Sequence, residues 1–137
     1  MTDTNVLGFI GLGVMGEAMC RNLATKSGAR MVAYDTRSRP LDALAQDGVE
    51  RAGSVADIAT RARTIFVCLP EEPQVRAVCL GHEGLVAHVQ AGQTVVDMST
   101  VPVALARELR TGFERHRSDE GRDRRATRGG VPPRAQT

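Results

Sequence analysis

A glycine-rich segment near the N-terminus constrains this chain of 137 residues more than any other feature. The apolar run at residues 6–10 leads directly into Gly11-Leu12-Gly13-Val14-Met15-Gly16, which an amphipathic segment follows. This order is typical of the turn between the first strand and the first helix of a dinucleotide-binding domain. The next apolar run ends at Asp35, 19 residues beyond Gly16, where such domains hold an acid for the adenosine ribose.

The three glycines are each expected to serve a separate physical purpose. Gly11 lets the chain turn off the strand, Gly13 lets the backbone approach a pyrophosphate, and Gly16 lets the next helix pack closely. The first turn of that helix would direct its N–H groups and positive dipole end at the phosphates. An ordinary turn is the competing explanation, because a chain with 14 glycines produces such spacings by chance. The combined pattern favours a cofactor site formed by Gly11, Leu12, Gly13, Val14, Met15, Gly16 and the ribose ligand Asp35.

Length and composition indicate one ordinary globular domain. A chain of 137 residues is long enough to bury a core, and 42% hydrophobic with 25% charged residues is usual for soluble proteins. No apolar stretch approaches the length that crosses a bilayer, and the first residues lack the basic flank of a signal peptide. We therefore expect a cytoplasmic protein with no membrane segment.

The cysteines and histidines give no support for a disulfide or a metal site. Cys20, Cys68 and Cys79 are odd in number, form no C-x-x-C pair and lie in segments expected to be buried or helical. This favours reduced core thiols. The three histidines are not spaced as metal ligands with a carboxylate or thiol. We therefore predict no bound metal.

Strand-like and helix-like segments alternate up to about residue 114, which predicts an α/β fold with a doubly wound parallel sheet of the Rossmann type. Ser54 is placed to cap the third helix, with Asp57 three positions on. Ligands of such sheets bind beyond the carboxyl ends of the strands. The predicted strands span 6–10, 30–34, 64–69 and 94–97, with a short one as an option at 49–51, and the predicted helices span 14–27, 40–46, 55–63, 73–80 and 102–115.

The chain changes character near Glu114. Residues 1–114 carry 11 Lys/Arg and 13 Asp/Glu, a net charge of −2, whereas residues 115–137 carry 7 and 3, a net charge of +4. The second segment lacks apolar periodicity and contains several glycines and prolines. We therefore predict a dinucleotide-binding domain over 1–114 and a disordered basic tail over 115–137. Acids interleave with its arginines and it has no aromatic residue, so we expect no nucleic-acid binding.

Four motifs in order resemble those of one enzyme family. They are residues 8–16 continued by Met19, Asn22 and Leu23, then Cys68-Leu69-Pro70, then residues 78–81 with Glu83-Gly84-Leu85, and finally Val95-Val96-Asp97-Met98-Ser99-Thr100. Together they resemble the β-hydroxyacid dehydrogenases, a family that includes 3-hydroxyisobutyrate dehydrogenase and 6-phosphogluconate dehydrogenase. The resemblance covers about residues 6–113 and implies the N-terminal NAD(P)-binding domain of such an enzyme.

The resemblance also implies roles for residues that follow two later strands. Leu69 and Pro70 would line the nicotinamide side of the cofactor cleft, and Gln74 would approach the cofactor. Ser99 and Thr100 match a D-x-S-T segment whose hydroxyl and backbone contact the substrate carboxylate and the nicotinamide ribose. Both residues also suit a simple cap of the last predicted helix, and the two roles are compatible.

The choice between NAD and NADP depends on the segment from Tyr34 to Arg39. Asp35 opposes a 2′-phosphate by like charge and favours NAD, whereas Arg37 and Arg39 would reach such a phosphate and favour NADP. The arginines suit a solvated loop at least as well. We predict NAD as the cofactor, with Asp35, Thr36 and Arg37 among its contacts, and keep NADP as the alternative.

The resemblance stops after Phe113. Relatives continue into another strand, a motif whose lysine is the catalytic acid/base, and a large helical domain, whereas Lys26 in the first predicted helix is the only lysine here. We therefore assign no catalytic residue. Gly129-Gly130-Val131-Pro132 resembles a glycine pair of the family, and the genetic code permits codons for residues 123–127 that encode a family-like segment in the neighbouring frame. We hypothesise a truncated member with a frame disruption near residue 115, which an undisturbed coding sequence without family-like codons would contradict.

These observations predict the cofactor-binding domain of an NAD(P)-dependent oxidoreductase of the 3-hydroxyacid dehydrogenase type, inactive on its own. The alternative is a non-catalytic dinucleotide-binding module, or a subunit that a second chain completes. A small 3-hydroxy acid is expected as substrate only when a helical domain completes the site. Apolar surface left without that domain would also favour self-association.

Overall fold

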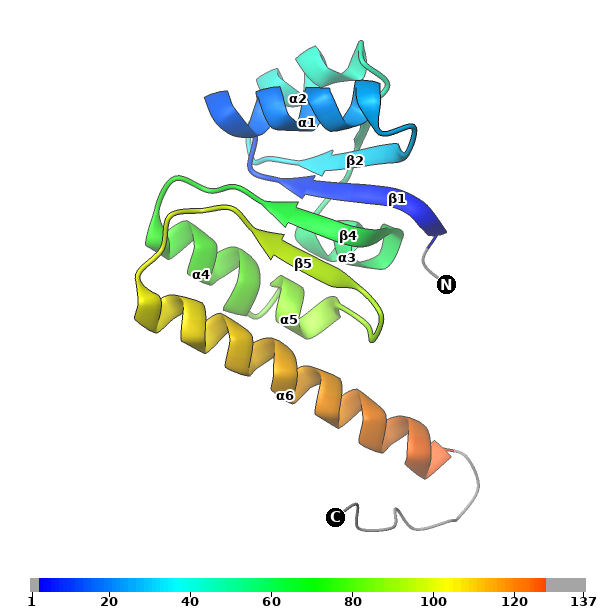
Figure 1. Ribbon diagram of the computed structural model, residues 1–137, viewed down its shortest axis with the longest axis vertical. Helices are drawn as coiled ribbons and strands as arrows, with labels where there is room; N and C mark the ends of the chain where they lie inside the picture. The colour runs from blue at the N-terminus through cyan, green and yellow to red at the C-terminus, as the bar shows by residue number, and fades with distance from the viewer. Residues whose placement is uncertain (1–2, 128–137) are drawn as a thin grey trace.

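The computed structural model describes residues 3–127 and contains one parallel sheet with helices on both faces. The strands lie in the order β3-β2-β1-β4-β5 (Figure 1). They are β1 (Asp3–Ile10), β2 (Arg30–Tyr34), β3 (Glu50–Arg51), β4 (Ala62–Val67) and β5 (Thr94–Asp97). The helices are α1 (Val14–Lys26), α2 (Ser38–Ala45), α3 (Val55–Arg61), α4 (Glu72–Leu80), α5 (Leu85–His88) and α6 (Val103–Thr127).

Every strand pair in the sheet is parallel, so each connection must cross over one face. β1 pairs with β2 on one side and with β4 on the other, and β4 pairs with β5 through Val67 and Asp97 at its last rung. α1 and α2 cover one face, whereas α3, α4, α5 and α6 cover the other (Figure 1). The predicted doubly wound Rossmann-type fold is confirmed.

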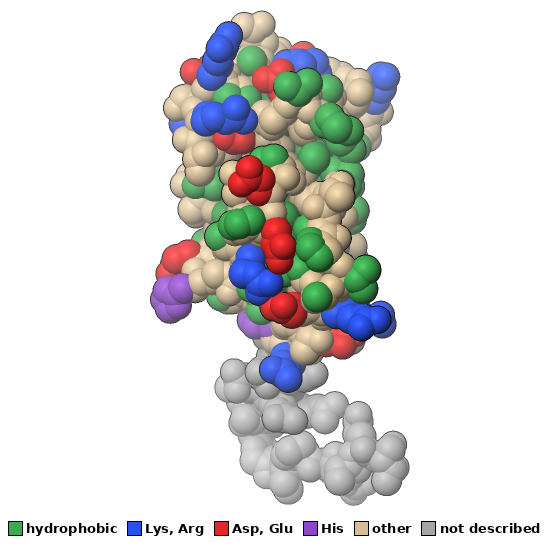
Figure 2. Space-filling model, turned by 90° about the vertical axis from the view of Figure 1, so that its left-hand side faces the viewer, with side chains coloured by type: hydrophobic (Ala, Val, Ile, Leu, Met, Phe, Trp, Pro, Cys, Tyr) green, Lys and Arg blue, Asp and Glu red, His purple; other side chains and the backbone are tan. Residues whose placement is uncertain are grey.

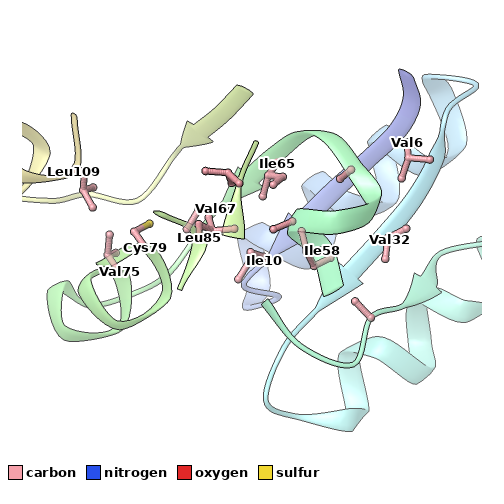
Figure 3. Close-up of a cluster of buried hydrophobic side chains, with 14 of the residues drawn as sticks. Val6, Ile10, Val32, Ile58, Ile65, Val67, Val75, Cys79, Leu85 and Leu109 are labelled. Carbon is pink, nitrogen blue, oxygen red and sulfur yellow. The ribbon is translucent and has the colours of Figure 1, made fainter. Parts of the chain in front are cut away.

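The larger hydrophobic core lies between the sheet and helices α3 to α6. Inward-facing residues of β1 and β4, such as Ile10 and Ile65, meet Ile58 of α3 and Leu85 of α5, all at most 1% exposed (Figure 3). Leu109 of α6 packs at the edge of the same cluster. Burial of such aliphatic side chains stabilises a fold by about 1.5–3 kcal/mol each, so this core anchors the β4 and β5 half of the sheet.

A second core lies on the opposite face, under α1 and α2. Phe9 of β1 and Met31 of β2 pack with Cys20 of α1 and Leu44 of α2. The Phe9 and Phe66 rings stack with centroids 6.0 Å apart. Consecutive β1 residues thus serve opposite cores, as the twofold period of a strand requires.

Most predicted elements are present, but several boundaries differ. β4 starts at Ala62 and ends at Val67, because its first residue already pairs with Asp3 and its last with Ile10. Helix α5 was not predicted, because its four residues are too few to show a helical period. The predicted cap of α3 is confirmed: Ser54 Oγ accepts the Asp57 N–H at 3.0 Å.

The final helix is longer than expected. It was predicted to end near Arg115, but α6 continues to Thr127, so the predicted end of this helix is wrong. Residues 115–127 contain five arginines, which favour a helix, and no proline, and the single Gly121 costs a helix only about 1 kcal/mol relative to alanine. The glycine pair Gly129-Gly130 and the rest of the predicted tail lie outside the described residues.

The described part of the chain contains neither a membrane-spanning helix nor a cluster of metal ligands. No helix among these residues is long and apolar enough to cross a membrane. They also contain no cluster of three or more His, Cys, Asp or Glu side chains able to hold a metal ion. All three cysteines, which fall within residues 3–127, are free thiols.

Candidate dinucleotide-binding site

The carboxyl ends of β1, β2, β4 and β5 meet along one edge of the sheet, which faces the viewer in Figure 2. Here the connections from the neighbouring strands β1 and β4 depart to opposite faces of the sheet. Parallel α/β sheets bind ligands at such switch points. Figure 2 shows hydrophobic side chains over this face, with acidic and basic side chains side by side just below its centre and more of both near its upper end.

Gly11 makes the turn from β1 in a conformation that only glycine adopts readily. Its φ is +97°, and its N–H donates to the Tyr34 carbonyl at 3.1 Å. A Cβ at Gly11 would lie 2.1 Å from the Cys68 carbonyl oxygen, and one at Gly16 would lie 2.1 Å from the Gly11 carbonyl oxygen. Both positions therefore exclude every larger residue, and the start of α1 packs directly on the turn.

Gly13 has a different environment from the other two glycines. It is the N-cap of α1, no side chain caps the helix there, and a Cβ built on it meets nothing within 4 Å. The next two side chains, Val14 and Met15, are 93% and 71% exposed. The first-turn N–H groups have no partner within the helix, and the positive end of the helix dipole lies at the same point. This open, uncapped helix end suits an anionic group such as a pyrophosphate.

Asp35 lies directly after β2 and holds the glycine turn in place. Its Oδ2 accepts the Leu12 N–H at 2.8 Å, and its Oδ1 accepts the Arg37 N–H at 2.9 Å. Burial by itself would raise the pKa of this carboxyl, but the Arg37 guanidinium and these two backbone N–H groups together lower the pKa below its ordinary value of 3.8. Asp35 is thus a fixed carboxylate, only 9% exposed, beside the cofactor turn.

Arg37 spans the gap between Asp35 and the glycine turn. Its Nε donates to Asp35 Oδ1 at 3.1 Å, and one terminal nitrogen donates to the Leu12 carbonyl at 3.2 Å. Thr36 and Arg39 are exposed on either side of it. The structure therefore places Asp35, Thr36 and Arg37 next to the turn, with the Arg37 charge paired to Asp35.

The residues after β4 and β5 form the other half of the edge. The Cys68 N–H donates to the Ile10 carbonyl at 2.9 Å, and the Leu69 N–H donates to Ser99 Oγ at 2.8 Å. Pro70 and Thr100 are exposed next to these two residues. The structure thus brings the four residues that the resemblance implied, Leu69, Pro70, Ser99 and Thr100, to the same edge as the glycine turn.

Gln74 and Lys26 lie outside these two groups of residues. Gln74 is exposed in the first turn of α4, where its backbone N–H bonds to the Glu71 carbonyl. Lys26 is the last residue of α1 and therefore lies at the end of that helix remote from the glycine turn. Its ammonium group is thus not placed at the candidate site.

The contacts that organise these residues could not be predicted from the sequence. The Leu12–Asp35 and Leu69–Ser99 hydrogen bonds join residues 23 and 30 positions apart. No local sequence pattern predicts such long-range hydrogen bonds, because they depend on the register of the strands. Cys68 lies between the two halves of the edge, and burial raises the pKa of its thiol, with a smaller contribution from the charge of Asp97.

Comparisons with known proteins agree with this geometry. Residues 6–119 match the model of the NAD-binding domain of 6-phosphogluconate dehydrogenase. A probable mitochondrial 3-hydroxyisobutyrate dehydrogenase of Dictyostelium discoideum is 32% identical over 117 residues, which are 85% of this chain and 36% of the relative. The NAD-dependent L-serine dehydrogenase of Pseudomonas aeruginosa is 33% identical over 103 residues, 75% of this chain and 34% of the relative. The chain spans about a third of the length of these curated relatives.

Two solved structures have the same fold. One is Psf3 in complex with NADP+ and 2-OPP, which is 32% identical and superposes with a TM-score of 0.76 over 80% of this chain and 39% of that one. The other is the imine reductase from Myxococcus stipitatus in complex with NADP+, which is 25% identical, with a TM-score of 0.73 over 81% and 37%. By its matched sequence and its fold, the chain belongs to the family of the NAD-binding domain of 6-phosphogluconate dehydrogenase.

Proposed function

We propose that this chain binds a nicotinamide dinucleotide along the carboxyl edge of its sheet. The observation that carries the proposal is the first turn of α1, which is exposed, has no side-chain cap and opens into free space at Gly13. The pyrophosphate would accept hydrogen bonds there, and Asp35 would face the adenosine ribose. The nicotinamide half would extend toward Leu69 and Ser99. The matched family and the NADP+ in two relatives support this assignment.

We further propose that the chain prefers NAD to NADP. A 2′-phosphate at the end of β2 would approach the carboxylate of Asp35, which is held ionised by its hydrogen bonds. Arg37 offers a positive charge, but it is already committed to Asp35 and the Leu12 carbonyl. Binding of a 2′-phosphate by Arg37 would have to break these contacts, whereas a ribose hydroxyl would not.

Calorimetric titration of the chain with NADH and NADPH tests both statements. We expect saturable binding of each cofactor, with the lower Kd for NADH. Arg37→Ala removes the only cation bonded to Asp35 through a side chain among the described residues, so the preference for NADH should increase. The absence of saturable binding of either cofactor at millimolar concentration would refute the site. Tighter binding of NADPH would refute only the preference.

The role in catalysis is proposed on the same basis. The chain would hold the cofactor in a hydroxyacid oxidoreductase, and Ser99 and Thr100 would contact the carboxylate of a small 3-hydroxy acid once a further, helical part completes the pocket. Lys26, the one lysine of the sequence, lies away from the site, so proton transfer would depend on that further part. Turnover on mixing with a helical fragment would support this role. NADH binding without turnover under any pairing would favour a non-catalytic module.

We also propose that the chain self-associates through apolar side chains at this edge. Val14, Met15 and Val103 are the large hydrophobic side chains most exposed in the described part of the chain, and all three lie at starts of helices that leave the carboxyl edge of the sheet. Exposed apolar groups at one edge favour contact with another apolar surface. A monodisperse monomer at all concentrations in sedimentation velocity would contradict this expectation.

A further inference from the structure

A side-chain hydrogen bond extends the pairing of β4 and β5 beyond the end of both strands. The ladder closes where the Met98 N–H donates to the Val67 carbonyl at 2.8 Å. The Leu69 N–H then donates to Ser99 Oγ at 2.8 Å. Leu69 and Ser99 each lie two residues beyond the last paired residues, Val67 and Asp97, so they are in the same register. The Ser99 hydroxyl therefore accepts the N–H that a backbone carbonyl would accept if the ladder continued.

Both partners of this hydrogen bond are themselves held. The Ser99 N–H donates to Asp97 Oδ1 at 2.9 Å, which fixes the backbone that carries the hydroxyl. The Leu69 side chain lies against the glycine turn, because a Cβ built on Gly11 would be 2.9 Å from Leu69 Cδ2. Ser99 therefore sets the position of Leu69 relative to the turn that leaves β1.

We propose that Ser99 is a positioning residue that holds the Leu69-Pro70 segment in the conformation that receives the nicotinamide half of the dinucleotide. This inference rests on the proposed function. A serine hydroxyl has one donor and two acceptor positions, and the Leu69 N–H occupies an acceptor. The O–H proton is left to donate to a ligand oxygen, so holding the segment and binding a ligand are compatible tasks for one side chain.

The adenosine half of the site does not depend on Ser99. The glycine turn is held by the hydrogen bond from Gly11 to the Tyr34 carbonyl and by the one from Leu12 to Asp35. The N–H groups at the start of α1 belong to the backbone that follows β1, and their position does not require the Ser99 hydroxyl. Loss of the Ser99 hydroxyl should therefore weaken binding of a complete dinucleotide but not of ADP-ribose, which lacks the nicotinamide. A general loosening of the fold would weaken both ligands together.

The test compares the Kd values of NADH and ADP-ribose for the complete chain and three variants. For Ser99→Ala we expect the Kd of NADH to rise about fivefold, the usual effect of one lost hydrogen bond, and the Kd of ADP-ribose to stay within about twofold. Ser99→Thr keeps a hydroxyl and should restore NADH binding. Ser54→Ala is the matched control, because it removes a serine hydroxyl that accepts a backbone N–H at 3.0 Å in α3. It should change neither Kd.

The other outcomes overturn the inference in distinguishable ways. Equal losses for NADH and ADP-ribose in Ser99→Ala would assign the hydroxyl a purely structural role, and unchanged values for both would remove any role. Binding of ADP-ribose but not NADH by the unaltered chain would reject the nicotinamide half alone. Binding of neither ligand by the unaltered chain would reject the proposed function together with the inference.

Discussion

Substitution of Gly13 by aspartate should stabilise the protein and at the same time abolish cofactor binding. Gly13 has φ −65° and ψ −172°, which any residue adopts, and a Cβ there meets no atom within 4 Å. An aspartate at this N-cap would accept a first-turn N–H and would place a negative charge at the positive end of the α1 dipole. From these two effects we expect the free energy of unfolding to rise by about 0.5–1 kcal/mol.

The same carboxylate would repel the pyrophosphate. At a separation of about 5 Å and an effective dielectric constant of about 20, two unit charges of like sign repel each other by about 3 kcal/mol. A loss of about 3 kcal/mol raises a Kd by more than about 100-fold. The aspartate would also occupy the N–H groups that the phosphates require, so the calculated loss is a lower bound.

Gly13→Asn distinguishes the effect of the negative charge from the effect of the capping side chain itself, because asparagine caps a helix as well as aspartate but is neutral. Urea denaturation would measure the stability of both variants, and calorimetry would measure NADH binding. We expect about a tenfold weaker affinity for Gly13→Asn, the equivalent of one lost charge-assisted hydrogen bond, and a much larger loss for Gly13→Asp that 1 M NaCl partly reverses. Equal losses in the two variants, or NADH binding by Gly13→Asp within threefold of the unaltered chain, would refute the reasoning.

Three further predictions concern stability and reactivity. Asp35→Asn should lower the free energy of unfolding at pH 7 by about 2 kcal/mol. Because the folded-state pKa of Asp35 is lowered below 3.8, the carboxylate stabilises the fold above that pH, and urea titrations should show the difference between the two proteins decreasing as the pH falls below 3.8. A difference that grows on acidification would contradict this prediction. Leu105→Ala removes a side chain that is only 1% exposed and should lower the free energy of unfolding by about 2–5 kcal/mol in the same assay. The control Val103→Ala changes a side chain that is 68% exposed on the same helix and should lower it by under about 0.5 kcal/mol. Alkylation at pH 8 followed by mass spectrometry should modify Cys68 first, because burial raises the pKa of the other two thiols to about 12, and faster modification of a buried thiol would count against the described core.

The fold could be predicted because its signals are local. The glycine pattern after residues 6–10 and the repeated change from strand-like to helix-like segments specify a parallel sheet with crossover helices. The cap at Ser54 was predictable for the same reason, since a capping residue and its partner are three positions apart. Element ends were less predictable where a strand partner decides them, as at Ala62, which pairs with Asp3.

The organisation of the candidate site was not predictable, because it depends on contacts between strand ends. Asp35 was predicted to bind the adenosine ribose, but its two oxygens already accept hydrogen bonds from the backbone N–H groups of Leu12 and Arg37. Arg37 was considered a phosphate ligand or a solvated side chain, and the structure shows it bonded across the turn instead. These contacts follow from the register of β1 and β2, which composition and spacing do not report.

The hydrogen bonds that organise the edge all join residues of the described part of this chain. One set runs from Gly11 to Tyr34 and from Leu12 to Asp35, and the other joins Cys68 to Ile10 and Leu69 to Ser99. The four strand ends are therefore linked to one another without any contact from outside the chain. Cofactor affinity should accordingly be a property of this chain alone, even where turnover requires a further part. A dinucleotide that bound only after such a part was added would show that the edge is not preorganised by these contacts.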